Sequence, residues 1–128
     1  MLLPVTALYA AILTLILMAL AINVTLHRRS LHVGLGDGSN PVMLRMMRIH
    51  GNAAEYIPIA VLLMLVYELN GGSHTALHLC GCALVLGRVL HVAGLWNSDG
   101  QTPGRAMGQS LTWLAILALV ALDLSKVL

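Results

Sequence analysis

Charge is scarce in this sequence: only 9% of its 128 residues are Asp, Glu, Lys or Arg. A soluble domain carries about a quarter charged residues and slightly under half apolar ones. By contrast, 59% of this chain is hydrophobic and its mean hydropathy is +0.87. So few polar side chains cannot cover a surface that meets water, and we therefore expect the protein to fold in lipid.

Cysteine is scarce too, since the chain has two, Cys80 and Cys82, one residue apart in an apolar run. This spacing matches neither a zinc motif nor a secreted disulfide framework, so we expect two small buried side chains. The formal net charge of +2 is too small to indicate a nucleic-acid partner.

The apolar residues gather in four runs, each long enough to cross a bilayer, which takes about 20 residues of helix. Four crossings use most of the 128 residues and leave no room for a separate soluble domain. The sequence therefore predicts a single domain of the all-α class, an integral membrane four-helix bundle. Its spans are expected to cover roughly residues 2–26, 42–69, 75–96 and 103–124.

Turn residues separate these spans. The segment from His27 to Pro41 is rich in glycine and basic residues and is predicted as a loop, which ends where Asn40 caps a helix beginning with proline. Shorter turns are predicted at Asn70–Ser73 and at Asn97–Gly100.

Two features within the spans predict local structure. Pro58 removes one backbone hydrogen bond from the second span, so a kink or a loosened turn is expected near Ala54. Gly81, Gly87 and Gly94 fall roughly on one face of the third span. Because small residues let membrane helices approach closely, this face is predicted to pack against another helix.

The basic residues predict the orientation of the chain in the membrane. With four spans, the loops after the first and third spans lie on one side and both termini lie on the other. Lys126 alone belongs to the side of the termini. The positive-inside rule then places the two loops in the cytoplasm and both termini outside it. The six arginines on the loop side are Arg28, Arg29, Arg45, Arg48, Arg88 and Arg105.

Arg48, Asn52 and Glu55 stand at i, i+4 and i+7 on the second span and so share one helix face. Glu55 lies inside the span, where an ionised group is costly unless it is paired or faces a wet cavity. One interpretation is an internal ion pair of Glu55 with Arg48 or Arg88 that only holds helices together. Because the face also carries an amide, we favour a polar site.

Further polar residues fall at the same predicted depth. Arg88 and His91 share a face of the third span, and Arg105 follows Pro103 in the first turn of the fourth. An arginine at the positive end of a helix is unfavourable, and an anionic ligand would relieve it. Several arginines, one carboxylate and an amide suit a small zwitterionic ligand with excess negative charge. No metal is expected, because no third ligand accompanies the weak pair His74 and His78.

The stretch RIHGNAAEYIP, from Arg48 to Pro58, resembles the second-helix signature of the MAPEG superfamily, the membrane-associated proteins in eicosanoid and glutathione metabolism. The spacing of Arg, Asn, Glu, Tyr and Pro is the specific part. The length, the four spans, the basic first loop and the arginines of the third and fourth spans also match. The resemblance therefore covers nearly the whole chain. Because it is to members of the bacterial type, it implies that the protein lies in a bacterial inner membrane.

This resemblance implies a bundle assembled as a homotrimer, with glutathione held between neighbouring subunits at the cytoplasmic side. It also implies that Arg105 stabilises the glutathione thiolate. The electrophile is then expected to be a hydrophobic molecule that enters from the lipid. The residues implied to bind glutathione are Arg28, Arg48, Asn52, Glu55, Tyr56, Arg88 and His91.

The chain departs from the family pattern at two positions. Leu95 stands where several eicosanoid synthases carry a tyrosine, and Ala106 stands where the prostaglandin synthase has a serine. The sequence thus predicts a glutathione transferase or glutathione-dependent peroxidase acting on lipophilic electrophiles. The alternatives are a non-catalytic glutathione- or lipid-binding scaffold of the same family, a small four-span exporter and a purely structural membrane subunit. The sequence leaves open the electrophile and whether glutathione or another thiol is used.

Overall fold

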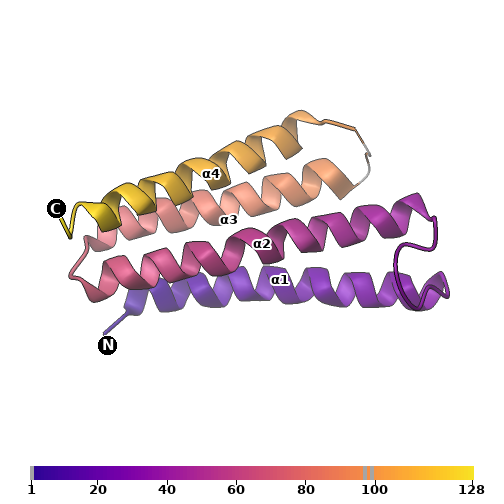
Figure 1. Cartoon of the computed structure of the whole chain (residues 1–128), viewed down its shortest axis with the longest axis horizontal. Helices are drawn as coiled ribbons and strands as arrows, with labels where there is room; N and C mark the ends of the chain where they lie inside the picture. The colour runs from indigo at the N-terminus through magenta and orange to yellow at the C-terminus, as the bar shows by residue number, and fades with distance from the viewer. Residues whose placement is uncertain (1, 97, 99) are drawn as a thin grey trace.

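Four long helices run alongside one another in the computed structural model, which describes residues 2–96, 98 and 100–128 (Figure 1). They are α1 (Pro4–Ser30), α2 (Pro41–Leu69), α3 (His74–Trp96) and α4 (Pro103–Leu124). Each is long and apolar enough to cross a membrane, and the described residues contain no strand. The prediction of an all-α, four-helix membrane bundle is confirmed.

The helices pack most extensively as two hairpins, α1 with α2 and α3 with α4. In addition, α2 packs against both α3 and α4 and α1 contacts α3, whereas α1 and α4 do not meet within the described part of the chain. Both chain ends and the α2–α3 turn lie at one end of the bundle, which we call the terminal end (Figure 1). The 31–40 loop and the α3–α4 connection lie at the opposite, loop end.

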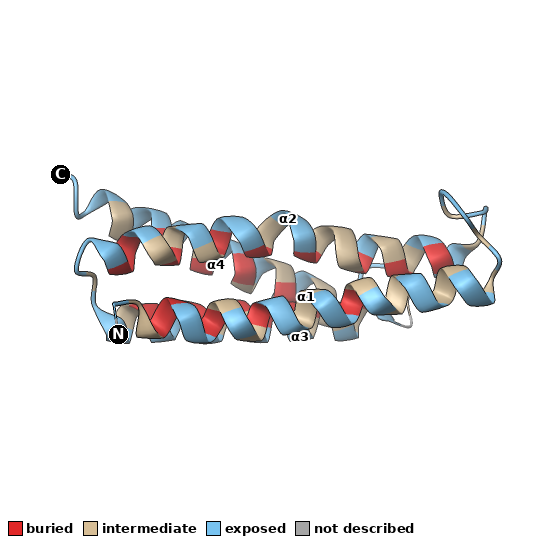
Figure 2. Cartoon of the chain, turned by 90° about the horizontal axis from the view of Figure 1, so that it is seen from below, coloured by how far each residue is buried: buried red, intermediate tan, exposed pale blue. Residues whose placement is uncertain are grey.

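Apolar side chains cover the outside of the bundle as well as its core. Buried residues follow the inner faces of the helices, while exposed residues follow the outer faces (Figure 2). The outer faces nevertheless carry large hydrophobic side chains on every helix, among them Leu15, Leu62, Leu79 and Leu117. A soluble bundle would place polar residues there, so this surface fits contact with lipid.

The helix boundaries follow from local sequence signals. α2 begins as predicted, because the Asn40 side chain accepts hydrogen bonds from the backbone N–H groups of Val42 and Met43 at 2.9 and 3.1 Å. α2 also continues through Pro58 without a break. The prediction that a loop begins at His27 is wrong, since α1 continues to Ser30.

The longer α1 has a physical reason. Its last turn carries the basic residues His27, Arg28 and Arg29, and cations at a helix C-terminus interact favourably with the negative end of the helix dipole. Of the turn predicted at Asn97–Gly100, residues 97 and 99 lie outside the described residues.

Glu68, near the end of α2, caps the start of α1 and was not singled out from the sequence. The N-cap position of α1, Leu3, offers no side-chain acceptor. Instead, the buried Glu68 carboxylate accepts hydrogen bonds from the backbone N–H groups of Val5, at 3.0 Å, and Thr6, at 2.7 Å. His74 Nε2 lies 3.5 Å from the same carboxylate. The first turn of α1 is thus held by a charge from another helix.

The glycines of α3 lie where another chain segment approaches closely, as predicted. A methyl group at Gly94 would overlap the backbone of Arg105 in α4, and one at Gly87 would also collide with α4. Gly81 points elsewhere and lies under the ring of Tyr9 in α1. The prediction of one packing face is therefore confirmed for Gly87 and Gly94 and wrong for Gly81, and the close contact at Gly94 fixes the position of the first turn of α4.

We predict that Glu68→Gln lowers the thermal stability of the protein, because it keeps the side-chain shape but removes the charge and one acceptor. A capping contact is worth about 0.5–2 kcal/mol, and a negative charge at a helix N-terminus adds to it. Thermal unfolding of the detergent-purified protein measures the loss. Glu55→Gln, on the same helix, is the matched control and should leave the Tm unchanged. Equal Tm values for the two variants would contradict the capping role.

Candidate functional site

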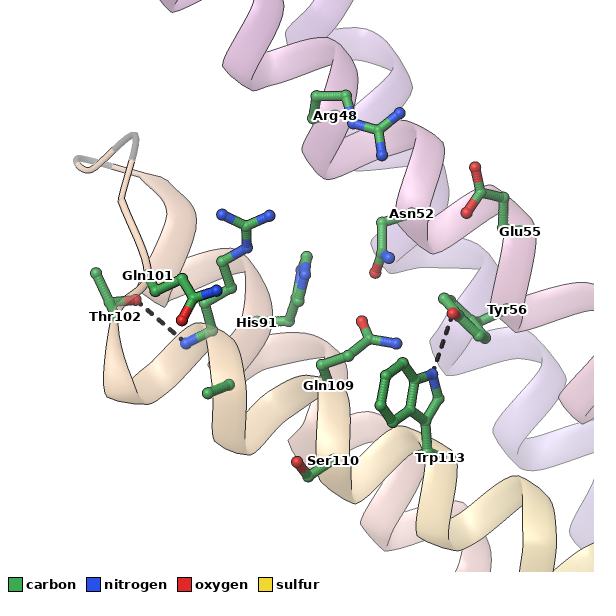
Figure 3. Close-up of a pocket in the computed structure, with 12 residues that line it drawn as sticks. Arg48, Asn52, Glu55, Tyr56, His91, Gln101, Thr102, Gln109, Ser110 and Trp113 are labelled. Carbon is green, nitrogen blue, oxygen red and sulfur yellow. Dashed lines mark hydrogen bonds between the residues drawn. The ribbon is translucent and has the colours of Figure 1, made fainter.

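Polar residues of α2, α3 and α4 surround one cavity of about 460 Å³ (Figure 3). Side chains projecting from α2 face those of α3 and α4 across it. The structure brings together six of the eight residues that the sequence predicted for a site. These six are Arg48, Asn52, Glu55, Tyr56, His91 and Arg105.

The predicted polar face of α2 opens onto this cavity. Arg48 and Glu55 are exposed and Asn52 is partly buried. Among the described residues, neither Arg48 nor Glu55 forms a hydrogen bond or an ion pair with another side chain, and Glu55 is not paired with Arg88. The interpretation of this face as an internal ion pair is therefore wrong. Both charges remain free to bind a ligand.

Arg88 lies behind the cavity wall rather than in it, and only 1% of its surface is exposed. Its Nη1 donates to Asn52 Oδ1 at 2.6 Å, while Nε and Nη2 donate to the Thr112 hydroxyl at 3.1 and 2.6 Å. The guanidinium also lies over the Tyr56 ring, 5.6 Å from its centroid. Arg88 thus orients Asn52 and Tyr56 and places a positive charge behind them.

α4 contributes cavity residues that were not predicted from the sequence. The indole N–H of Trp113 donates to the Tyr56 hydroxyl at 3.0 Å, which ties α4 to α2 across the cavity. The other unpredicted residues that line the cavity are Gln101, Thr102, Ala106, Gln109 and Ser110. The spacing of Arg105, Gln109 and Thr112 at i, i+4 and i+7 is the signal that could have identified this face.

The carboxamide of Gln109 is the most informative of these groups. In Figure 3 it points from α4 toward α2, between His91 and Tyr56. Both of its polar atoms are buried, and neither has a hydrogen-bond partner among the described residues. A buried amide without a partner costs about 1–3 kcal/mol. It therefore offers the two N–H donors of its amide nitrogen and its carbonyl oxygen acceptor to a ligand in the cavity.

Arg105 lies in the first turn of α4, as predicted. The Thr102 hydroxyl caps this turn by accepting from the Arg105 backbone N–H at 3.2 Å, and it donates to the Gly94 carbonyl at 2.6 Å. The Arg105 side chain makes one long hydrogen bond, from Nη1 to the Gly100 carbonyl at 3.4 Å. A positive side chain and the positive end of a helix thus meet at the same edge of the cavity.

Arg28 is not brought into this cavity. Its Nη1 donates to the Gly36 carbonyl at 2.9 Å, so the side chain holds the loop that follows α1. It lines a separate, open depression together with Arg29 and His32. Within one chain, Arg28 and the cavity residues are therefore apart.

The cavity combines an excess of positive charge with neutral hydrogen-bonding groups. Arg48 and Arg105 line it and Arg88 stands behind it, against one carboxylate, Glu55. The described residues contain no group of three or more His, Cys, Asp or Glu side chains that could hold a metal ion. Such a cavity can bind a small anion that also carries an ammonium group and amides.

The two departures from the family pattern lie in different surroundings. Leu95 is buried in the apolar core and does not line the cavity, whereas Ala106 lines it. Neither side chain has a hydroxyl that could contact a ligand in the cavity.

Comparison with known proteins places the chain in a family. A profile of the MAPEG family matches residues 6–124. The protein named inner membrane protein YecN, from Escherichia coli K12, is 41% identical over 120 residues, which cover 94% of this chain and 90% of that protein. The protein of the same name from Escherichia coli O6:H1 has the same identity and coverage. Because the profile spans nearly the whole chain, this protein belongs to the MAPEG family.

Proposed function

We propose that this protein is a membrane-bound glutathione transferase or glutathione-dependent peroxidase that acts on lipophilic electrophiles. The observation that carries the proposal is the cavity between α2 and α4, where two arginines, one carboxylate and the unpartnered amide of Gln109 converge. Glutathione has two carboxylates, one ammonium, two peptide amides and a thiol. Each kind of group has a matching partner in this cavity.

In this proposal the charged residues hold the two ends of glutathione. Arg48 binds a carboxylate through parallel N–H groups, and Glu55 binds the ammonium. Asn52 and Gln109 pair with peptide amides, and Tyr56 and His91 complete the walls. Arg28 joins the site only from a neighbouring subunit, so we further propose a homotrimer with the ligand between subunits.

Arg105 is proposed to stabilise the glutathione thiolate. A free thiol has a pKa of about 8.5, and the thiolate is the nucleophile. A guanidinium at a helix N-terminus favours the anion and so raises the reactive fraction at neutral pH. In the transferase reaction, the thiol proton passes to water and the thiolate sulfur bonds to an electrophilic carbon. That carbon either loses a leaving group with its electron pair, or belongs to a double bond whose electron pair moves to the neighbouring atom and is then protonated from water. In the peroxidase reaction, two glutathione molecules reduce a hydroperoxide to an alcohol and water and become a disulfide.

The membrane location matches this chemistry. The apolar outer faces of the helices let a hydrophobic substrate approach from the lipid. We propose that the protein lies in the bacterial inner membrane, which agrees with the name of its Escherichia coli relative. We also propose that the loop end faces the cytoplasm and both termini face out, because six of the seven Lys and Arg residues belong to the loop side.

A second candidate is a non-catalytic glutathione- or lipid-binding protein of the same family. Ala106 in the cavity wall and the buried Leu95 favour it, because neither supplies a hydroxyl near the thiol. The presence of Arg105 at the edge of the cavity favours the enzyme. An exporter or a purely structural subunit has less support, because α1 contains no carboxylate and the α2 charges are not paired with each other.

We predict that Arg48→Ala and Glu55→Gln each weaken glutathione binding by more than about tenfold. Each removes one half of a charge-assisted contact worth about 1.5–3 kcal/mol. Calorimetric titration with glutathione measures the affinity, and thermal unfolding without ligand should give the parental Tm. Glu68→Gln serves as the reverse control, with a lowered Tm and parental affinity. A lowered Tm and unchanged affinity for the cavity variants would show that this face is structural.

For Arg105→Ala we predict glutathione affinity within a few fold of the parent, because other residues hold the carboxylates, but a bound thiol whose pKa rises toward its free value. The rate at which the variant joins glutathione to an electrophile should fall most near neutral pH and recover partly at alkaline pH. Each pKa unit regained corresponds to about 1.4 kcal/mol.

Ultraviolet absorbance of the bound thiolate, titrated against pH, tests this role of Arg105. Arg29→Ala, at an exposed arginine outside the cavity, is the matched control and should reproduce the parental curve. If Arg105→Ala also reproduces it, Arg105 does not act on the thiol and the non-catalytic candidate is preferred.

A further inference from the structure

A second group of reactive side chains lies in the half of the bundle nearer the terminal end, away from the cavity. It consists of Tyr9 from α1 and of His78 and Cys82 from α3. The Tyr9 hydroxyl lies 3.1 Å from His78 Nδ1 and 3.1 Å from Cys82 Sγ. It also donates to the His78 backbone carbonyl oxygen at 3.2 Å, so its proton lies between two acceptors of the same residue. A phenol therefore joins a thiol to an imidazole.

The packing of α1 against α3 builds this arrangement. Gly81 has no side chain, so the Tyr9 ring lies directly against the α3 backbone, and a methyl group there would overlap the ring. Tyr9 is 5% exposed, and its ring meets the His78 ring edge-on, with the two planes at 70°. His78 and Cys82 are four residues apart and therefore share a helix face. The Tyr9 hydroxyl sits between them.

The hydrogen-bonding capacity of the three groups allows a proton to pass from the thiol to the imidazole. A phenol donates one proton and accepts others, while a neutral imidazole nitrogen can accept one. The Cys82 thiol can thus donate to the Tyr9 oxygen while Tyr9 donates to His78 Nδ1. A base activates a nucleophile by taking its proton, and here the Tyr9 hydroxyl would carry that proton from Cys82 to His78.

The two cysteines of the chain differ in a way that the sequence did not indicate. The prediction that both are buried is wrong for Cys82, which is exposed, whereas Cys80 is buried. Residues two apart on a helix lie on different faces, so one thiol faces the core and the other faces outward. Around Cys82, the neighbouring turns of α3 present the exposed side chains Leu79 and Leu86. A molecule that reaches this thiol must therefore partition into an apolar environment.

We propose that Cys82, Tyr9 and His78 form a second reactive site, at which the Cys82 thiol adds to lipophilic α,β-unsaturated carbonyl compounds that arrive from the lipid. The sulfur forms a bond to the β-carbon, and the carbon–carbon double bond becomes an enolate. The thiol proton passes through the Tyr9 oxygen to His78 and then to the α-carbon. The addition requires no oxidant or reductant, and it is independent of the function proposed for the cavity.

The test uses N-phenylmaleimide, a lipophilic Michael acceptor, on the full-length protein in lipid nanodiscs. Mass spectrometry of peptides follows the labelling of Cys82 and Cys80 over time. Cys82 should react more than tenfold faster than Cys80. In Tyr9→Phe and in His78→Gln, Cys82 should react about tenfold more slowly than in the parent. The matched control is Tyr67→Phe. Tyr67 is also buried but lies in α2, and its hydroxyl has no hydrogen bond within the described residues, so this variant should leave the rate of Cys82 labelling unchanged.

Exposure alone would also make Cys82 react faster than Cys80, so the variants decide the proposal. Parental Cys82 rates in both Tyr9→Phe and His78→Gln would overturn it and leave Tyr9 as a packing residue. His78 is exposed, so His78→Gln keeps the test decisive if Tyr9→Phe fails to fold. A Cys82 that reacts no faster than Cys80 would also overturn the proposal.

Discussion

The buried guanidinium of Arg88 is the group on which the geometry of the cavity depends. It belongs to α3, donates to Asn52 in α2 and to Thr112 in α4, and so joins three helices. A charge inside a membrane span is tolerated only where polar groups surround it. The Thr112 hydroxyl, the Asn52 amide and the Tyr56 ring surround the Arg88 guanidinium, and these contacts hold the three groups in position. The wall of the cavity is therefore built by contacts within the fold that need no ligand.

The two carboxylates of α2 show how the same residue type takes different roles along one helix. Glu68 is buried and accepts two backbone N–H groups, so its bonding capacity is used within the fold. Glu55 is exposed to the cavity and has no partner in the described residues. A group whose hydrogen bonds are complete stabilises the fold, whereas one whose bonds are incomplete at a cavity is available to a ligand. The same contrast separates Arg88 from Arg48.

Much of the fold could be predicted because lipid imposes a simple requirement on the sequence. The four apolar runs gave the helices, and Asn40 gave the start of α2. The α2 face was predictable because charged residues stand out inside a span. Gln109 and Thr112 were missed because they are neutral, although they follow Arg105 by four and seven residues and so lie on the same side of α4. Glu68 was missed because its partners, the first N–H groups of α1, lie more than 60 positions away in the sequence.

Contacts between segments distant in sequence account for the remaining differences. Helix periodicity places Cys80 and Cys82 on different faces, but which of the two faces outward depends on how α3 packs against the other helices. The position of Arg28 depends on the fold of the loop that begins at Leu31. Local periodicity identified which residues share a face, and tertiary packing decided which faces meet.

The most direct test of the proposed ligand compares two molecules of which only one carries carboxylates. Glutathione and its diethyl ester share the thiol, the ammonium and both peptide amides, but the ester has no carboxylates. Calorimetric titration of the purified protein should show glutathione binding more than about tenfold tighter than the ester, because the ester forms no charge-assisted contacts with the arginines. Equal affinities for the two molecules, or no binding of glutathione, would contradict the assignment of the cavity.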